Sequence, residues 1–368
     1  MTKKTLQKIF KKISYGLFFL IYGKIVKSLD SNSDSRIKVE PVLKNKKIKY
    51  KIYIIKNGSL YTDRIQDTAI LIDRCIIEGP SFQYRDNNLS PINNNIVFEK
   101  GTPRKLKKLN GKVLSLLTGG AGNNNYWHWI YDVLPRLALC DEIIKLSDVD
   151  YFLVPSLNKK FQLETLNELN IPTEKLLSSD KYRHIKSNEL IATDHPYAIS
   201  GDSTKDIHNI PSWICLWLKD KFLTNKSTYK KNLPKKIYID RSDSTSNLSK
   251  LRALVNENEI KKIMNKNGFE NVRLSDLHFA DQVQLFYQAD YIVGLHGAAF
   301  ANLVFCKPNT KVLEFQSTTA GQVIENIAKA NNLIYSSIRC KPIDYDFSNQ
   351  FGHIEIPLEE LQKKILNL

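Results

Sequence analysis

Short apolar runs alternate with amphipathic runs from residue 236 to residue 340, and this alternation constrains the fold more than any other feature of the sequence. The apolar runs are predicted strands, and the runs between them carry apolar residues at helical spacing. Two strands joined through a helix pair in parallel by a right-handed crossover. The sequence therefore predicts an α/β, Rossmann-like domain in this region. The predicted strands are residues 236–239, 271–274, 291–293, 312–315 and 333–335, and the predicted helices are residues 251–266, 275–289 and 321–330.

End signals accompany two of these helices. Ser275 precedes an apolar-periodic run and is a predicted N-cap, because its hydroxyl can accept a backbone N–H of the first turn. Gly268 follows another run and is a predicted C′ residue, a position that favours left-handed backbone. The tail from residue 357 to residue 368 is a further predicted amphipathic helix.

The amino-terminal half has a similar but less regular alternation. Strands are predicted at residues 51–55, 69–72, 75–77, 113–117, 151–154 and 190–192, and helices at residues 125–146 and 160–169. Residues 219–236 hold seven lysines and one aspartate, and Pro234 near their end marks a domain boundary. The predicted organisation is a basic helix at 1–30, an α/β domain at 31–218, the Lys-rich interdomain segment at 219–236, a Rossmann-like domain at 237–350 and a final helix at 351–368.

The amino end is strongly basic and apolar at once. Residues 1–27 hold seven lysines and no acidic residue, but the apolar run from Ile13 to Val26 has only 14 residues. About 20 are needed to span a bilayer, and no small-residue cleavage site of a signal peptide follows. This pattern predicts a helix on an anionic membrane surface; the alternative is a helix packed on its own domain. Apolar residues at helical spacing are Leu6, Ile9, Phe10, Ile13, Leu17, Leu20 and Ile21.

The overall charge and the cysteines exclude other classes. The chain carries 54 basic and 38 acidic side chains, a formal net charge of +16, but only 11 of the basic residues are arginine. Arginine is the preferred bidentate partner of phosphate and guanine, so the composition argues against a nucleic-acid binder. The cysteines are odd in number and widely spaced, which indicates free thiols in a reducing compartment. The same pattern argues against disulfides and against a zinc site. They are Cys75, Cys140, Cys215, Cys306 and Cys340.

Three signals lie where ligands bind a parallel sheet, outside the carboxyl ends of its strands. Gly294-Leu295-His296-Gly297-Ala298-Ala299 follows a predicted strand and opens a helix, where small residues and free amides suit a phosphate. Glu314 ends another predicted strand, where its carboxylate could accept ribose hydroxyls. Arg241 and Arg252 suit a diphosphate. The alternatives are a tight turn, a solvent-facing charge and surface ion pairs.

The densest group of polar and aromatic residues runs from Asn123 to Arg136. His128 and Asp132 are four residues apart, so they share one helix face, and a carboxylate beside an imidazole makes a general base. The predicted sugar or acceptor contacts are Asn124, Asn125 and Trp127. The alternative is an ordinary His–Asp pair at a helix start. The pair Asp148 and Asp150 has the spacing of a metal-binding DxD motif, which occurs often by chance, and no metal site is predicted there.

Together these residues resemble glycosyltransferase family 61, over roughly residues 119–315. The family includes plant β-1,2-xylosyltransferases, animal O-linked N-acetylglucosamine transferases and bacterial capsule and lipopolysaccharide enzymes. The matching residues are Asn125, His128, Asp132, Pro135, Arg136, the run Tyr238-Ile239-Asp240-Arg241, Arg252, Asn256, Glu257, Gln282, His296, Gly297, Ala298, Asn302 and Glu314.

The resemblance implies a GT-B fold, with two Rossmann-like domains facing a cleft, and an inverting transfer without an essential metal. It implies a UDP-sugar donor on the carboxy-terminal domain, held by Arg241, Arg252, His296, Gly297, Ala298, Asn302 and Glu314. It implies an acceptor on the amino-terminal domain, with His128 as base and Asp132 orienting it. We expect a bacterial enzyme at the cytoplasmic face of the membrane, acting on a surface-polysaccharide or lipid-linked glycan. The alternatives are a nucleotide-sugar epimerase of the same fold and a non-catalytic membrane-surface scaffold.

Overall fold

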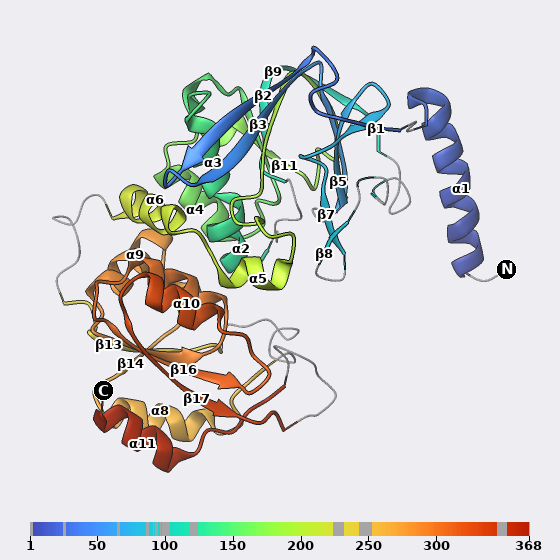
Figure 1. The fold of residues 1–368 in the computed structure, drawn as a ribbon. Coiled ribbons are helices and arrows are strands. Elements are labelled where there is room, and N and C mark those ends of the chain that lie inside the picture. Colours follow the sequence, from blue (N-terminus) through green and yellow to red (C-terminus); the bar gives the residue numbers. More distant parts are fainter. Residues whose placement is uncertain are drawn as a thin grey trace. The chain divides into compact units, whose positions relative to one another are not determined.

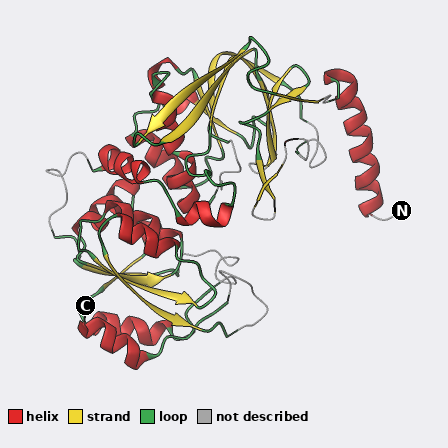
Figure 2. Ribbon diagram, in the orientation of Figure 1, coloured by secondary structure: helices red, strands yellow, loops and turns green. Residues whose placement is uncertain are grey.

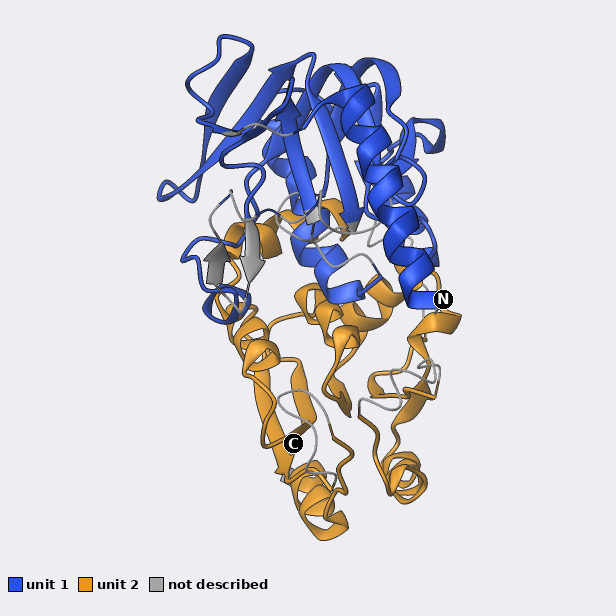
Figure 3. Cartoon of the chain, turned by 90° about the vertical axis from the view of Figure 1, so that its right-hand side faces the viewer, with its two compact units in different colours: residues 1–207 blue, residues 208–368 orange. Residues whose placement is uncertain are grey.

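The computed structural model describes residues 3–24, 27–64, 67–85, 88–90, 92, 95, 97, 104–117, 124–223, 232–242, 252–343 and 352–367. The chain folds into two compact units, Met1–Ile207 and His208–Leu368 (Figure 3). Helix α6 (Ser212–Phe222) therefore belongs to the second unit, whereas its residues up to 218 were predicted to belong to the first domain and the rest to the interdomain segment. Of the Lys-rich segment, residues 224–231 lie outside the described residues.

The first unit is built on a ten-stranded mixed sheet (Figure 1). The order is β1-β6-β5-β4-β12-β9-β10-β11, with β3 also paired to β12 and β2 paired to β3. These strands are β1 (Lys27–Leu29), β2 (Ile37–Lys44), β3 (Ile48–Lys56), β4 (Ser59–Arg64), β5 (Asp67–Ile72), β6 (Cys75–Ile77), β9 (Lys107–Ser115), β10 (Tyr151–Val154), β11 (Leu176–Ser178) and β12 (His184–Thr193). The separate strands β7 (Gln83–Arg85) and β8 (Asn88–Ser90) form a hairpin.

The expectation of a Rossmann-like first domain is right only for part of this sheet. Strands β12, β9, β10 and β11 pair in parallel. Strand β2 pairs antiparallel with β3, and β4 pairs antiparallel with β5. Strands β3 and β4 each pair antiparallel with β12. Strands β3 and β4 run in the same direction along β12 and keep one register, so Asn57-Gly58 interrupts the strand without reversing the chain. The chain reverses between β2 and β3, where the short connection at residues 45–47 allows only an antiparallel pair. The unit is α/β in class, with a mixed sheet.

The helices of the first unit lie beside this sheet and at its edge. They are α1 (Lys3–Tyr22), α2 (Tyr126–His128), the π-helix η2 (Trp129–Val133), α3 (Pro135–Asp141), α4 (Lys160–Glu168) and α5 (Ser203–His208), with short 3-10 turns η3 (Leu146–Asp148) and η4 (Thr173–Lys175).

Helix α1 docks on the first unit through its carboxy-terminal part. Phe18 is buried, and its ring lies 5.6 Å from the ring of Tyr61 and 5.5 Å from that of His184. The hydroxyl of Tyr22 accepts the backbone N–H of Leu106 at 3.0 Å. Within the described residues, no helix combines the length and the apolar character that crossing a bilayer requires. Apolar side chains of α1 that remain exposed are Leu6, Ile9, Phe10, Ile13, Leu17, Leu20 and Ile21.

The second unit contains the predicted parallel sheet, with helices on both faces (Figure 2). Its order is β14-β13-β15-β16-β17, and every pair is parallel. In chain order this is 2-1-3-4-5, the order of flavodoxin-like doubly wound sheets. The strands are β13 (Lys236–Ile239), β14 (Glu270–Val272), β15 (Tyr291–Leu295), β16 (Lys311–Ser317) and β17 (Ile334–Cys340); the helices are α6, α8 (Glu257–Lys266), α9 (Phe279–Gln288), α10 (Val323–Ala330), α11 (Leu358–Asn367) and 3-10 segments η6 (Leu274–Asp276) and η7 (Ala298–Phe305).

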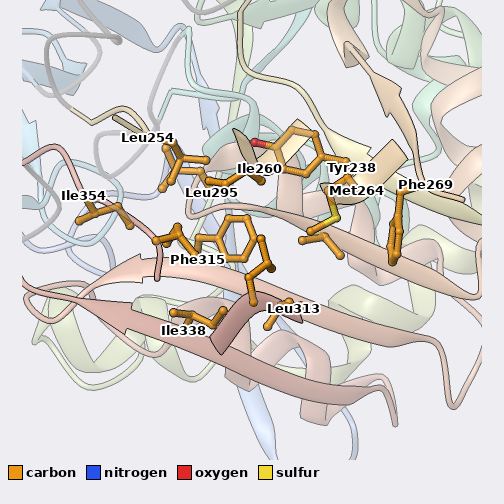
Figure 4. Packing of buried hydrophobic residues seen from close by; sticks show 13 residues of the cluster. Tyr238, Leu254, Ile260, Met264, Phe269, Leu295, Leu313, Phe315, Ile338 and Ile354 are labelled. Atoms are coloured by element: carbon orange, nitrogen blue, oxygen red, sulfur yellow. The ribbon is translucent and has the colours of Figure 1, made fainter. Parts of the chain in front are cut away.

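One face of this sheet is covered by α8 and α11 around a buried apolar cluster (Figure 4). Alternate strand residues such as Tyr238 and Phe315 point into the cluster and meet Ile260 and Met264 of α8. Leu361 of α11 completes the cluster from the carboxy-terminal tail. This burial is the physical reason why the 2-residue period of the strands and the 3.6-residue period of the helices are both visible in the sequence.

The predicted ends of two helices need correction. Helix α8 begins at Glu257 and not at residue 251. Helix α9 begins after His278, whose Nδ1 accepts the N–H of Ala280 at 3.3 Å, so His278 and not Ser275 is its N-cap. Gly268 does follow α8 with a φ of 78°, as predicted for a C′ residue.

Candidate active site

The first candidate group lies on a helical segment that a proline interrupts. The sequence predicts one helix over residues 125–146, but α2 passes through the π-helix η2 into α3, which ends at Asp141. Pro135 has no N–H to donate within the helix. The N–H of Leu134 donates instead to the carbonyl of Trp129, five residues back, at 3.1 Å. Such π-turns are frequent at functional sites.

His128 and Asp132 are paired on this segment. Nδ1 of His128 lies 2.7 Å from Oδ2 of Asp132; the histidine side chain is 31% exposed and the aspartate side chain 3%. Burial lowers the pKa of His128, but the charge of Asp132 and the hydrogen bond to it outweigh burial, so the pKa is raised above 6.5. A carboxylate that accepts Nδ1–H leaves the lone pair on Nε2, the atom that can receive a proton. The pair therefore has the geometry of a general base.

Two buried side chains lie near Asp132: His195, which was not predicted to belong to the site, and Arg136, which matches the family pattern but was given no role. Nε2 of His195 lies 3.7 Å from Oδ2 of Asp132. Arg136 is fully buried, and its Nε donates to the backbone carbonyl of Asp132 at 2.8 Å. Burial lowers the pKa of Arg136 to about 10, against the charge of Asp132. The one sequence signal for His195 is its place just after a predicted strand, which becomes β12, the parallel neighbour of β9.

The predicted sugar contacts differ in their surroundings. Asn125 is the N-cap of α2, because its side chain accepts the N–H of Trp127 at 2.9 Å. Asn124 is exposed. Trp127 is buried, with its ring 4.6 Å from the ring of Tyr131, and its buried indole N–H has no acceptor within the described part of the chain. Asn125 thus has a clear local role, whereas Asn124 and the Trp127 N–H stay predicted contacts.

The DxD pair has a structural role for its second member. Oδ2 of Asp150 accepts the backbone N–H of Lys112 at 2.7 Å. Asp148 lies in the short turn η3. Across the described ranges, no group of three or more His, Cys, Asp or Glu side chains is arranged to hold a metal ion.

The second candidate group lies in the second unit, at the point where the strand order reverses. Strands β13 and β15 are neighbours there, and ligands of doubly wound sheets bind at the carboxyl ends of such strands. Arg241 follows β13 and His296 follows β15. Nη1 of Arg241 donates to the carbonyl of His296 at 3.0 Å, and Nη1 of Arg252 donates to the same carbonyl at 3.1 Å.

The two guanidinium groups are close enough to affect each other. The pKa of Arg252 is lowered to about 10, first by burial and then by the charge of Arg241, while Glu314 opposes the shift. Two like charges held together are stabilised by an anion between them, as a diphosphate would supply. A pocket of about 240 Å³ opens here, and its lining includes Arg241, Arg252, Glu257 and Leu295.

The glycine at this turn keeps the backbone close to the arginines. A Cβ added to Gly297 would lie 3.3 Å from Nη1 of Arg241, tighter than most real Cβ contacts. Gly297 precedes η7, whose first residue is Ala298, and both are partly exposed. Both residues of this helix start are therefore partly accessible in the region where the sequence predicted a phosphate.

Glu314 lies in a different environment from the one expected. Strand β16 continues to Ser317, so Glu314 is inside the strand and not at its end. Its side chain is fully buried. Its carboxylate is hydrogen-bonded to Nδ1 of His296 and accepts a hydrogen bond from the hydroxyl of Tyr335 at 2.5 Å. A carboxylate with these partners orients the His296 ring through Nδ1 and is not open to ribose hydroxyls in this structure.

Asn302 is likewise enclosed by protein. It is fully buried on η7, and its Nδ2 donates to Oε1 of Gln282 on α9 at 3.1 Å. Nε2 of Gln282 donates in turn to the carbonyl of Leu274 at 2.9 Å. This chain of hydrogen bonds connects η7, α9 and η6, so Asn302 holds the loop in place and does not face the pocket lining described above.

A five-stranded parallel sheet with two arginines at its reversal point is typical of proteins that bind a phosphorylated ligand at that edge. The comparison with family models agrees with this class: the model of glycosyltransferase 61 matches residues 126–313. The match covers half of the chain and includes the His128–Asp132 pair, Arg241, Arg252 and His296, and the chain therefore belongs to glycosyltransferase family 61. No curated protein matches the chain. The protein is thus a glycosyltransferase, which uses a donor and an acceptor substrate.

Proposed function

We propose that this glycosyltransferase moves a sugar from a UDP-sugar to a hydroxyl group of a surface-polysaccharide or lipid-linked glycan, with inversion at the anomeric carbon. The acceptor oxygen attacks that carbon while the bond from the carbon to the diphosphate oxygen breaks. The acceptor proton goes to Nε2 of His128, and the nucleoside diphosphate leaves with the bonding electrons. The two-domain GT-B arrangement remains a prediction.

The observation that carries the donor half of the proposal is the convergence of Arg241 and Arg252 on one carbonyl. In the proposed reaction these two cations stabilise the charge that develops on the leaving diphosphate, and no metal is needed for that purpose. The amides of Gly297 and Ala298 face the same charge. His296 is held by Glu314, so its backbone carbonyl keeps both arginines in position.

The base half of the proposal predicts a pH dependence with a definite sign. His128 accepts a proton only when it is neutral, so transfer rises as pH increases through its pKa. Because Asp132 raises that pKa, the rise in kcat/KM is centred above 6.5. At high pH this limb reaches a plateau, because His128 is then fully neutral.

Calorimetry with a panel of UDP-sugars, combined with a transfer assay, tests both halves. The variant H128A should bind the donor like wild type but transfer no sugar. The variants R241A and R252A should lose donor affinity by about 1.5–3 kcal/mol each, the usual value of a hydrogen bond to a charged group. The matched control is R273A, because Arg273 is an exposed arginine of the same unit that pairs with Asp276.

Three results would contradict the proposal. Full turnover by H128A would remove the base assignment. A changed free UDP-sugar without acceptor product would identify an epimerase. Failure of every uridine nucleotide to bind would favour the non-catalytic scaffold.

The exposed side of α1 supports a membrane-surface location as part of the same proposal. At 100° per residue, its seven exposed apolar side chains lie on one side of the helix, away from Phe18, which faces the domain. Lys4, Lys8, Lys11 and Lys12 lie off this apolar side, so the helix has one apolar and one basic side, as in helices that lie in an anionic interface. We place the enzyme at the cytoplasmic face of a bacterial membrane, where lipid-linked acceptors are within reach.

A further inference from the structure

His195 is a buried histidine that the proposed reaction does not yet use. It follows β12 and is only 5% exposed. Its ring packs edge-on against the ring of Tyr197 at 4.6 Å, and its Nε2 lies 3.7 Å from Oδ2 of Asp132. The same carboxylate oxygen contacts Nδ1 of His128 at 2.7 Å. Asp132 therefore lies between two imidazole rings, one partly exposed and one buried.

The hydrogen bonds of His195 determine its tautomer. Its Nδ1 accepts the backbone N–H groups of Tyr197 at 3.3 Å and of Ala198 at 3.2 Å. A nitrogen that accepts two N–H groups carries a lone pair and no proton, so the proton of the neutral ring is on Nε2. Nε2–H is thus a donor on the side of Asp132. A separation of 3.7 Å is long for a hydrogen bond, but hydrogen bonds of catalytic groups often shorten in the substrate complex.

The charges around His195 favour its neutral form. Burial lowers its pKa; Asp132 opposes this shift, and the positive charges of Arg136 and of protonated His128 add to it. Asp132 faces these three groups, and Asp194 also acts on Arg136. Burial would raise the pKa of Asp132, but His128 and His195 hold it low. A second cation beside His128 would disfavour protonation of the base, whereas a neutral donor leaves that step intact.

We propose that His195 is a positioning residue of the glycosyl transfer: as a neutral Nε2–H donor, it holds the Asp132 carboxylate against Nδ1 of His128. The inference rests on the proposed role of His128 as base. Asp132 has a second oxygen, Oδ1, that is buried without a partner among the described residues. The orientation of this carboxylate is therefore set through Oδ2 alone, where the two histidines meet. Loss of His195 leaves space for water and lets the carboxylate turn away from His128.

Histidine NMR on the full chain tests this without any substrate. In protein labelled with 15N in the imidazole rings, the two-bond correlations distinguish the two neutral tautomers and the charged form. H128Q and H195Q assign the two signals. We expect the wild-type His195 ring to be the neutral Nε2–H tautomer at about pH 7. An Nδ1–H tautomer or a charged ring there would overturn the proposal.

The pKa of His128, read from the same spectra during a pH titration, gives the second measurement. In H195A it should fall toward 6.5, because the coupling to Asp132 weakens. In H195Q it should stay near the wild-type value, since the glutamine Nε2–H₂ can replace the lost donor. If the pKa is unchanged in H195A, or falls equally in both variants, His195 does not position the base.

A matched control separates positioning from general loss of packing. His184 is also buried and in the same unit, with its Nδ1 3.1 Å from the carbonyl of Arg104. H184Q should leave the pKa of His128 unchanged, and an equal shift there would overturn the specific role of His195. If H195A does not fold, the wild-type tautomer and the H195Q titration decide. Because no sugar transfer is measured, absence of the proposed activity would not affect these outcomes.

Discussion

Replacing Leu17 and Leu20 of α1 by glutamine should weaken binding to anionic lipid vesicles by about 100-fold. Leu17 is 56% exposed and Leu20 is 82% exposed, so neither contributes much to the folded core. Both belong to the exposed apolar side of α1, which does not include Phe18. Glutamine is a good helix former, so the helix itself should persist.

The magnitude follows from the exposed fractions. Full burial of a leucine side chain stabilises by roughly 2 kcal/mol. Scaled by the exposed fractions, Leu17 contributes about 1 kcal/mol and Leu20 about 1.6 kcal/mol when the lipid covers them. Together they approach 3 kcal/mol, and each 1.4 kcal/mol is a factor of about ten in affinity. The exposed lysines Lys8 and Lys12 add about 1 kcal/mol each on an anionic surface, so K8Q/K12Q should weaken binding by roughly 30-fold.

Sedimentation with vesicles of phosphatidylserine and phosphatidylcholine measures both effects. The control is L43Q, because Leu43 lies on β2, outside α1, and its side chain is 55% exposed, a fraction similar to that of Leu17. It should bind like wild type. The lysine variant should lose its difference from wild type at high salt or on pure phosphatidylcholine, where the electrostatic attraction is absent. Thermal unfolding should be unchanged in all variants, because the substituted side chains are exposed.

Two outcomes would refute the reasoning. If L17Q/L20Q binds anionic vesicles as tightly as wild type, the exposed side of α1 does not enter the lipid. If the wild-type chain does not bind either kind of vesicle, the helix serves another surface or none.

Two further predictions concern buried polar groups. D132N should lower kcat by about 10²- to 10⁴-fold, the usual contribution of general acid–base catalysis. It should also lower the free energy of unfolding, because the charge of Asp132 is the largest of those that offset the burial of Arg136; a urea titration that shows wild-type stability would contradict this second part. Y335F should lower the free energy of unfolding by about 1–3 kcal/mol, because one oxygen of Glu314 loses its buried hydrogen bond. It should also weaken UDP binding less than R241A does, and calorimetry that finds the reverse order would show that Tyr335 contacts the ligand directly.

The parallel sheet of the second unit could be predicted because its signals are local. The 2-residue and 3.6-residue periods, Gly268 after α8 and the glycines around His296 all act within a few residues. The mixed sheet of the first unit could not be predicted in the same way. Its antiparallel pairs, such as β3 with β12, join residues more than 130 positions apart. An apolar run in the sequence does not indicate which strand it will pair with, or in which direction.

The site shows the same division. The pairing of His128 with Asp132 follows from spacing along a helix, although the π-turn just before Pro135 was not predicted. Glu314 was expected to face a ligand because a short apolar run was taken to end there. The strand continues, and Tyr335 and His296, from two other segments, enclose its carboxylate.

By itself, the sequence determined the α/β class, the parallel order of elements in the second unit, the His128–Asp132 pair and the position of the two arginines after β13. Only the tertiary structure decided that Arg241 and Arg252 share the carbonyl of His296 and that His195 lies beside Asp132. The physical reason is that burial and hydrogen-bond partners depend on which distant segments pack together. Local spacing determines which face of its own helix or strand a side chain occupies, and the environment of that face is set by the rest of the fold.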